Sequence, residues 1–278
     1  MERIDIKTQR AKIENINALP TLPGTFKRIS QVIGKPGVTL DEIGRFIASD
    51  PALTTKVLKM VNSAVYGFPG RISSVSHAIM LLGLNVVKGL LLGVSVFEIM
   101  QKVMAGLWDH SLGCAAVART IAEKKGVKDP EEVSVAGLLH DLGKVILLLH
   151  YQPQYEAALE QAADRRISIY EAEREVFGET HAAVGLWLAE KWHFPAGLVE
   201  VIGYHHRPNQ SKRAPLETAI VHFADVLVRA RGFGFAGDEL AAVVHPGTFE
   251  LLALTEADIR EVLEKLENAL DDAGDLIL

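Results

Sequence analysis

A chain of 278 residues is long enough for one large domain or two modest ones. Hydrophobic residues make up 49% of it but aromatic residues only 6%, so runs typical of β-strands are scarce and packed helices are favoured. A net charge of −6 gives no general attraction to nucleic acid or to an anionic membrane. We therefore expect an all-α fold that binds neither.

The compartment can be inferred from three features of the sequence. The single cysteine, Cys114, cannot form an internal disulfide, which favours a reducing environment. Residues 1–5 show no apolar stretch of signal-peptide type. The most hydrophobic segment, residues 86–100, contains Lys88 and Glu98 and is too short to cross a bilayer. We expect a cytoplasmic protein.

The first 106 residues are predicted to form a lobe of short helices. Apolar residues at helical spacing mark helices within residues 26–33, 43–47 and 53–61. A capping box over residues 39–42 opens the second helix, and Asp50 followed by Pro51 opens the third. Gly106 is the predicted boundary between an N-terminal helical lobe (1–106) and a C-terminal helical domain (107–278), with the lobe packed on the domain.

The C-terminal domain is predicted to contain longer helices. The first covers residues 107–125, and the second opens at Asp129-Pro130 and is expected to run through His140 and Asp141 to about residue 149. Further helices are predicted to begin near Thr180 and Pro195, and another is predicted to contain Asp225. No segment demands a strand, which again favours an all-α fold.

Histidines and aspartates recur in apolar helical settings in this domain. The set comprises His110, His140, Asp141, His181, His205, His206 and Asp225. Buried imidazole and carboxylate groups are unfavourable unless hydrogen bonds or a metal ion satisfy them. Adjacent residues on a helix point about 100° apart, so His140 and Asp141 fit two neighbouring ions, with the aspartate as a bridge. Such ligands favour Fe or Mn and also suit Zn or Ni.

Each of these residues also has a purely structural interpretation. His140 and Asp141 could be a hydrogen-bonded core pair, His205-His206 could cap a helix C-terminus, and Asp225 could pair with Arg229. Cys114, one turn after His110, is interpreted as a core residue rather than a ligand. The joint pattern, more than any single residue, favours two divalent metal ions.

Lys144 lies one turn after His140, where its charge could neutralise phosphate oxygens. Asp141 and Lys144 are therefore the candidate catalytic residues. In this interpretation a metal-bridging hydroxide attacks phosphorus, and both ions together with Lys144 stabilise the developing charge.

The order of these residues resembles the HD superfamily of metal-dependent phosphohydrolases, especially the HD-GYP phosphodiesterases. The resemblance covers about residues 107–231. It implies that His110, His140, Asp141 and Asp225 hold one ion, that Asp141, His181, His205 and His206 hold the other, and that Lys144 faces the phosphate. The sequence lacks the Asp-Gly-x-Gly-Tyr-Pro motif of that branch, which argues against cyclic di-GMP as the substrate.

The first half resembles the HDOD family, a group of helical bacterial proteins that are related to the HD superfamily and regarded as regulatory. The resemblance rests on Leu19-Pro20-Thr21-Leu22-Pro23, Ser49-Asp50-Pro51-Ala52-Leu53, Val61-Asn62-Ser63-Ala64-Val65-Tyr66-Gly67 and His77-Ala78-Ile79 followed by Leu82-Gly83-Leu84.

Three functions follow as alternatives. The first is an HDOD-type signalling protein with a dinuclear metal site, whose partners are signalling proteins or a phosphate-containing small molecule. The second is a metal-dependent phosphodiesterase or phosphohydrolase. The third is a metal-free protein-interaction module.

Overall fold

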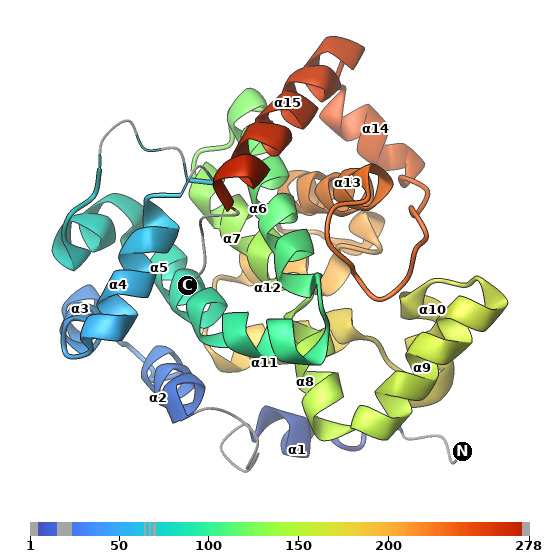
Figure 1. Ribbon diagram of the computed structural model, residues 1–278, viewed down its shortest axis with the longest axis horizontal. Coiled ribbons are helices and arrows are strands. Elements are labelled where there is room, and N and C mark those ends of the chain that lie inside the picture. Colours follow the sequence, from blue (N-terminus) through green and yellow to red (C-terminus); the bar gives the residue numbers. More distant parts are fainter. Residues whose placement is uncertain (1–4, 16–23, 64, 67, 69–70, 274–278) are drawn as a thin grey trace.

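The computed structural model is all-α, as the sequence predicts (Figure 1). It describes residues 5–15, 24–63, 65–66, 68 and 71–273, and no strand occurs among them. The Leu19–Pro23 motif lies outside the described residues. The helices are α1 (Arg10–Glu14), α2 (Gly24–Ile33), α3 (Leu40–Ala48), α4 (Pro51–Val61), α5 (Val75–Val103), α6 (Leu107–Lys124), α7 (Pro130–Leu139), α8 (Leu142–His150), α9 (Gln152–Arg165), α10 (Ile169–Phe177), α11 (His181–Lys191), α12 (Ala196–Tyr204), the 3₁₀ turn η2 (Pro208–Gln210), α13 (Pro215–Arg231), α14 (Pro246–Leu252) and α15 (Glu256–Ala273).

Local capping signals place the short helices of the first half as predicted. The backbone N–H of Glu42 donates to Thr39 Oγ1, and the N–H of Thr39 donates to Glu42 Oε2, which completes the capping box of α3. The Asp50 carboxylate accepts from two backbone N–H groups at the start of α4. Helices α2, α3 and α4 all pack against α5, so α5 is the core of the N-terminal lobe.

Helix α5 contains the most hydrophobic segment of the sequence, residues 86–100, and extends beyond it at both ends. It spans 29 residues and contains a kink at Gly83, whose φ of 73° lies in the left-handed region that favours glycine. By length and composition alone, α5 and the stretch 130–150 are each apolar enough to cross a membrane. Most of both stretches is buried inside the protein, as in the core helices of a soluble fold.

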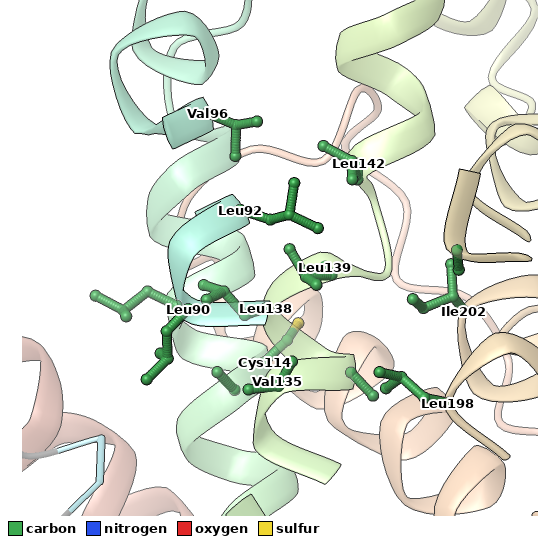
Figure 2. Packing of buried hydrophobic residues seen from close by; sticks show 14 of the residues in the cluster. Leu90, Leu92, Val96, Cys114, Val135, Leu138, Leu139, Leu142, Leu198 and Ile202 are labelled. Atoms are coloured by element: carbon green, nitrogen blue, oxygen red, sulfur yellow. The ribbon is translucent and has the colours of Figure 1, made fainter. Parts of the chain in front are cut away.

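The two lobes share one hydrophobic core through α5. Figure 2 shows Leu90 and Leu92 of α5 beside Leu138 and Leu139 of α7. A Cβ added to Gly89 would collide with the side chain of Val135, so glycine allows α5 to approach α7 closely. The predicted packing of an N-terminal lobe on a C-terminal domain is therefore confirmed, while the division at residue 106 stays a prediction.

The prediction of one continuous helix from residue 130 to residue 149 is wrong. Helix α7 ends at Leu139 and α8 begins at Leu142, so His140 and Asp141 form the junction between them. Asp141 has φ −96° and ψ 6°, outside regular helical geometry. This turn changes the direction of the chain between the two residues that carry the candidate ligands.

Close backbone contact between α8 and α11 holds the α7–α8 junction in place. A Cβ on Gly143 would collide with the backbone carbonyl of His181, and neither backbone segment can move aside as a flexible side chain would. Glycine is therefore required here by close approach, and this contact brings the first turn of α8 beside His181.

We predict that Gly143→Ala lowers the free energy of unfolding by about 1–3 kcal/mol, because the added methyl group must push α8 away from α11. Gly24→Ala is the matched control, since nothing lies within 4 Å of the Cβ that it adds. Urea denaturation of both variants measures the difference. Equal stability of Gly143→Ala and the wild type would show that α8 and α11 are not packed this closely.

Candidate metal centre

Five separate parts of the fold bring the seven predicted ligands together. His110 lies in the first turn of α6, and His140 and Asp141 form the α7–α8 junction. His181 is the first residue of α11, His205 and His206 directly follow α12, and Asp225 lies within α13. All are buried except His206, whose side chain keeps 11% of its surface exposed.

The first group of ligand atoms lies between α6, α7 and α13. The Nε2 of His110 is 3.3 Å from the Nε2 of His140 and 3.2 Å from Asp225 Oδ1. Cys114 Sγ is 3.5 Å from the same His110 nitrogen, so four potential ligands meet here. Burial raises the pKa of the Cys114 thiol well above its usual value. Its interpretation as a core residue stays a prediction.

The second group lies between the α7–α8 junction, α11 and the end of α12. His181 Nε2 is 3.4 Å from His205 Nε2 and 3.0 Å from His206 Nε2. Asp141 Oδ1 is 3.2 Å from the same His181 nitrogen, so three imidazoles and one carboxylate oxygen converge.

Asp141 lies between the two groups. Its Oδ2 is 3.4 Å from His140 Nε2 and 3.6 Å from His110 Nε2, on the side of the first group. Its Oδ1 faces His181 of the second group. Each carboxylate oxygen therefore faces a different set of histidines.

Hydrogen bonds on the far side of two imidazoles define which nitrogen faces the centre. The Nδ1 atoms of His140 and His205 each donate to a backbone carbonyl at 2.7 Å, from Gly137 and Ile202 respectively. Because a carbonyl can only accept, each Nδ1 carries a proton, and Nε2 is the nitrogen that points into the centre.

This arrangement of lone pairs fits metal ions. Ligands at about 2.1 Å from one ion lie about 3.0 Å apart at octahedral angles and about 3.4 Å apart at tetrahedral angles. The separations of 3.0–3.4 Å between paired Nε2 atoms match these values. Where both nitrogens of such a pair are unprotonated, their lone pairs repel unless a cation lies between them.

The charge states of Asp141, His205 and His206 also fit. Burial alone would raise the pKa of Asp141, but the neighbouring His140 and Lys144 outweigh it and hold that pKa well below its usual value. Burial lowers the pKa values of His205 and His206 well below normal, so both rings are neutral. Ionised carboxylates and neutral imidazoles are the forms that bind metal.

Two buried carboxylate oxygens in the centre remain without hydrogen bonds. Asp141 Oδ1 and Asp225 Oδ2 accept none from the residues that the structure describes. Leaving such charged oxygens unpaired is unfavourable in a protein interior, whereas coordination to a cation would satisfy both.

Sequence reasoning missed Glu173, which supports the second group. This fully buried carboxylate lies 2.6 Å from Nδ1 of His181 and accepts from the His181 backbone N–H and from the hydroxyl of Tyr155. A carboxylate that holds the outer nitrogen of a ligating histidine orients the ring and increases its basicity. The available signal was a charged residue on the apolar face of α10, one turn from both Ile169 and Phe177.

His222 is a second supporting residue that the sequence did not reveal. Its Nδ1 donates to the carbonyl of His205 at 2.7 Å, and its Nε2 accepts from the backbone N–H of His245 at 3.0 Å. The ring therefore ties the end of α12 to the segment before α14 and holds the backbone beside His206.

Lys144 is buried and directed at Asp141. Its Nζ donates to Asp141 Oδ2 at 2.6 Å and to the backbone carbonyl of Ala236 at 2.7 Å. The structure thus places its charge on the ligand carboxylate. Its catalytic role stays a prediction.

A family model gives the strongest comparison with known proteins. Residues 19–208 match the HDOD domain family. An uncharacterised protein of Treponema pallidum (strain Nichols) is 29% identical over 236 residues, which is 81% of this chain and 46% of that protein. This chain therefore spans about half the length of its relative.

Solved structures share the fold over the whole chain. An HDOD domain protein from Geobacter sulfurreducens is 27% identical, with a TM-score of 0.70 and coverage of 99% of this chain and 100% of that one. A proposed signal transduction protein from Marinobacter aquaeolei VT8 has a TM-score of 0.68 at 20% identity, over 100% of this chain and 62% of that one. A proposed phosphohydrolase from Shewanella amazonensis SB2B has a TM-score of 0.61 at 22% identity, over 92% and 98%.

We predict that Glu173→Gln weakens metal binding about tenfold, because the amide keeps the shape but removes the charge that orients His181. Titration of metal-free protein with Mn²⁺ measures the change. Glu175→Gln is the control on the same helix, since Glu175 is exposed and pairs with Arg165. Equal Mn²⁺ affinities for the two variants would contradict the supporting role of Glu173.

Proposed function

The chain belongs to the HDOD domain family, and we propose that it is a regulatory member whose C-terminal lobe holds two divalent metal ions. The observation that carries the proposal is the position of Asp141, whose two oxygens face two different histidine groups. A carboxylate in this position bridges a pair of ions, as in two-metal sites with ions about 3.5–4 Å apart.

The donor set assigns the ligands to each ion. His110, His140 and Asp225 would hold the first together with Asp141 Oδ2, and the second group would hold the other through Asp141 Oδ1. Mixed imidazole and carboxylate ligands favour Fe or Mn and also accommodate Zn or Ni. Two such ions, when bound, act as Lewis acids on a phosphoryl group and lower the pKa of water.

We infer that the regulatory ligand is a small molecule that carries phosphate. The ionised Asp141 and Asp225 contribute two negative charges, fewer than the four positive charges that two divalent ions bring. The loaded centre is therefore cationic and attracts anions. The intact ligand set supports this function over a metal-free interaction module.

Hydrolysis of that ligand is the second candidate function. It is favoured by the partial exposure of His206, which makes this the predicted ligand nearest to solvent. The chain contributes an ionised Asp141, and Lys144 holds one oxygen of that carboxylate in place. Mutation of either residue should therefore affect turnover more than metal-independent properties of the protein.

Metal content tests the first proposal. We predict about two ions per chain for the wild type by inductively coupled plasma mass spectrometry, with both lost in Asp141→Asn and only one lost in Asp225→Asn. The difference arises because Asp141 lies close to both histidine groups, at 3.4 Å from His140 and 3.2 Å from His181. Asp225 is 3.2 Å from His110 but 3.9 Å from His206, so it is the closer ligand of the first ion only.

Asp109→Asn is the control for these variants, since Asp109 precedes a predicted ligand but is exposed on α6. Its metal content should equal that of the wild type. Wild-type protein that contains no transition metal after anaerobic purification would rule out the two-metal centre.

Turnover distinguishes the second candidate from the first. We predict that Mn²⁺-loaded protein hydrolyses bis-p-nitrophenyl phosphate, that Asp141→Asn abolishes the activity, and that Lys144→Met lowers it by roughly 100-fold. Absorbance of released nitrophenolate measures the rate. Full metal loading without turnover of this ester or of nucleotides would leave a binding protein and exclude the hydrolase.

A further inference from the structure

His206 is the predicted ligand that lies nearest to solvent. The other six predicted ligands are essentially fully buried, whereas the His206 side chain is 11% exposed. A molecule from solvent therefore approaches the second histidine group past His206. The residues that surround this imidazole are the first that an incoming ligand meets.

Tyr170 of α10 forms one wall of this approach. Its ring centroid lies 4.7 Å from that of His206, with the planes tilted by 56°, and 6.2 Å from that of His181. The ring is half-buried, so one tyrosine contacts two of the three imidazoles of the second group and also reaches the surface.

Arg207 lies on the same tyrosine. Its Cζ is 5.5 Å from the centroid of the Tyr170 ring, in a cation–π contact. The side chain is half-buried, and no carboxylate of the described residues pairs with it. Other arginines on nearby elements are paired, such as Arg229 with Asp238 and Arg165 with Glu175. The guanidinium of Arg207 thus keeps its donors available next to a predicted metal ligand.

Lys144 cannot serve an incoming anion in this arrangement. Its Nζ already donates to Asp141 Oδ2 and to the carbonyl of Ala236, and the side chain is 1% exposed. Arg207, which is half-buried beside His206, is a cation that an anionic group can reach from solvent. A planar guanidinium also matches the oxygens of a phosphate in a bidentate contact.

We propose that Arg207 recognises the phosphate group of the small-molecule ligand and that Tyr170 positions its guanidinium beside His206. This inference rests on the proposed two-metal centre and names the residue that selects its ligand. Arg207 is thus a ligand-binding residue, and Tyr170 acts through it.

Binding of inorganic phosphate to the metal-loaded full chain tests the assignment by isothermal titration calorimetry. We expect Arg207→Ala to weaken binding at least about tenfold, as for loss of a charged hydrogen bond, and Arg207→Lys to give an intermediate affinity. Tyr170→Leu should weaken phosphate binding about two- to fivefold. Tyr170→Phe should bind phosphate with the wild-type affinity, because it keeps the aromatic ring. Arg213→Ala, in the exposed loop that follows η2, is the control and should bind like the wild type.

Metal content measured on the same samples separates the two proposals. Unchanged phosphate affinity in fully loaded Arg207→Ala would overturn the role of Arg207 and leave the metal centre intact. Wild-type protein without metal would overturn the two-metal proposal. If that metal-free protein binds phosphate and Arg207→Ala abolishes the binding, the role of Arg207 in phosphate recognition would still be supported. If it binds no phosphate, that role would be ruled out.

Discussion

The structure depends on one buried carboxylate, that of Asp141, between two groups of imidazole nitrogens. Such a charge is unfavourable in a protein interior unless positive partners surround it. Lys144 satisfies Oδ2, while Oδ1 accepts no hydrogen bond from the described residues and lies 3.2 Å from Nε2 of His181. A cation on each side of the carboxylate resolves this arrangement, which is why we propose two metal ions.

The surrounding fold holds the ligands in place before any ion binds. Three imidazoles have their outer nitrogens fixed, His140 and His205 by backbone carbonyls and His181 by Glu173. Gly143 permits the close contact of α8 with α11. The segment after α13 covers the centre, where the carbonyl of Ala236 accepts from Lys144. Fixed ligands of this kind bind with less loss of conformational entropy, so the fold contributes to affinity through preorganisation.

The helices and the types of candidate ligand could be predicted from the sequence. The break between α7 and α8 and the residues that contact the ligands could not. Capping signals such as that of Thr39 act within four residues, so they could be read directly. The break at His140 and Asp141 could not, because apolar residues continue on both sides without proline and the turn results from contact with α11. Glu173 lies on a different helix from His181, and Arg207 is placed by its contact with Tyr170 of α10. Their contacts depend on tertiary packing, which the local periodicity of a sequence does not reveal.

The central claim, that Asp141 bridges two ions, is tested most directly by anomalous diffraction from crystals of the Mn²⁺-loaded protein. The account predicts two anomalous peaks about 3.5–4 Å apart, one on each side of the Asp141 carboxylate. The peak on the first side should lie among His110, His140 and Asp225, and the other among the three imidazoles of the second group. A single peak, or none, at this carboxylate would contradict the account.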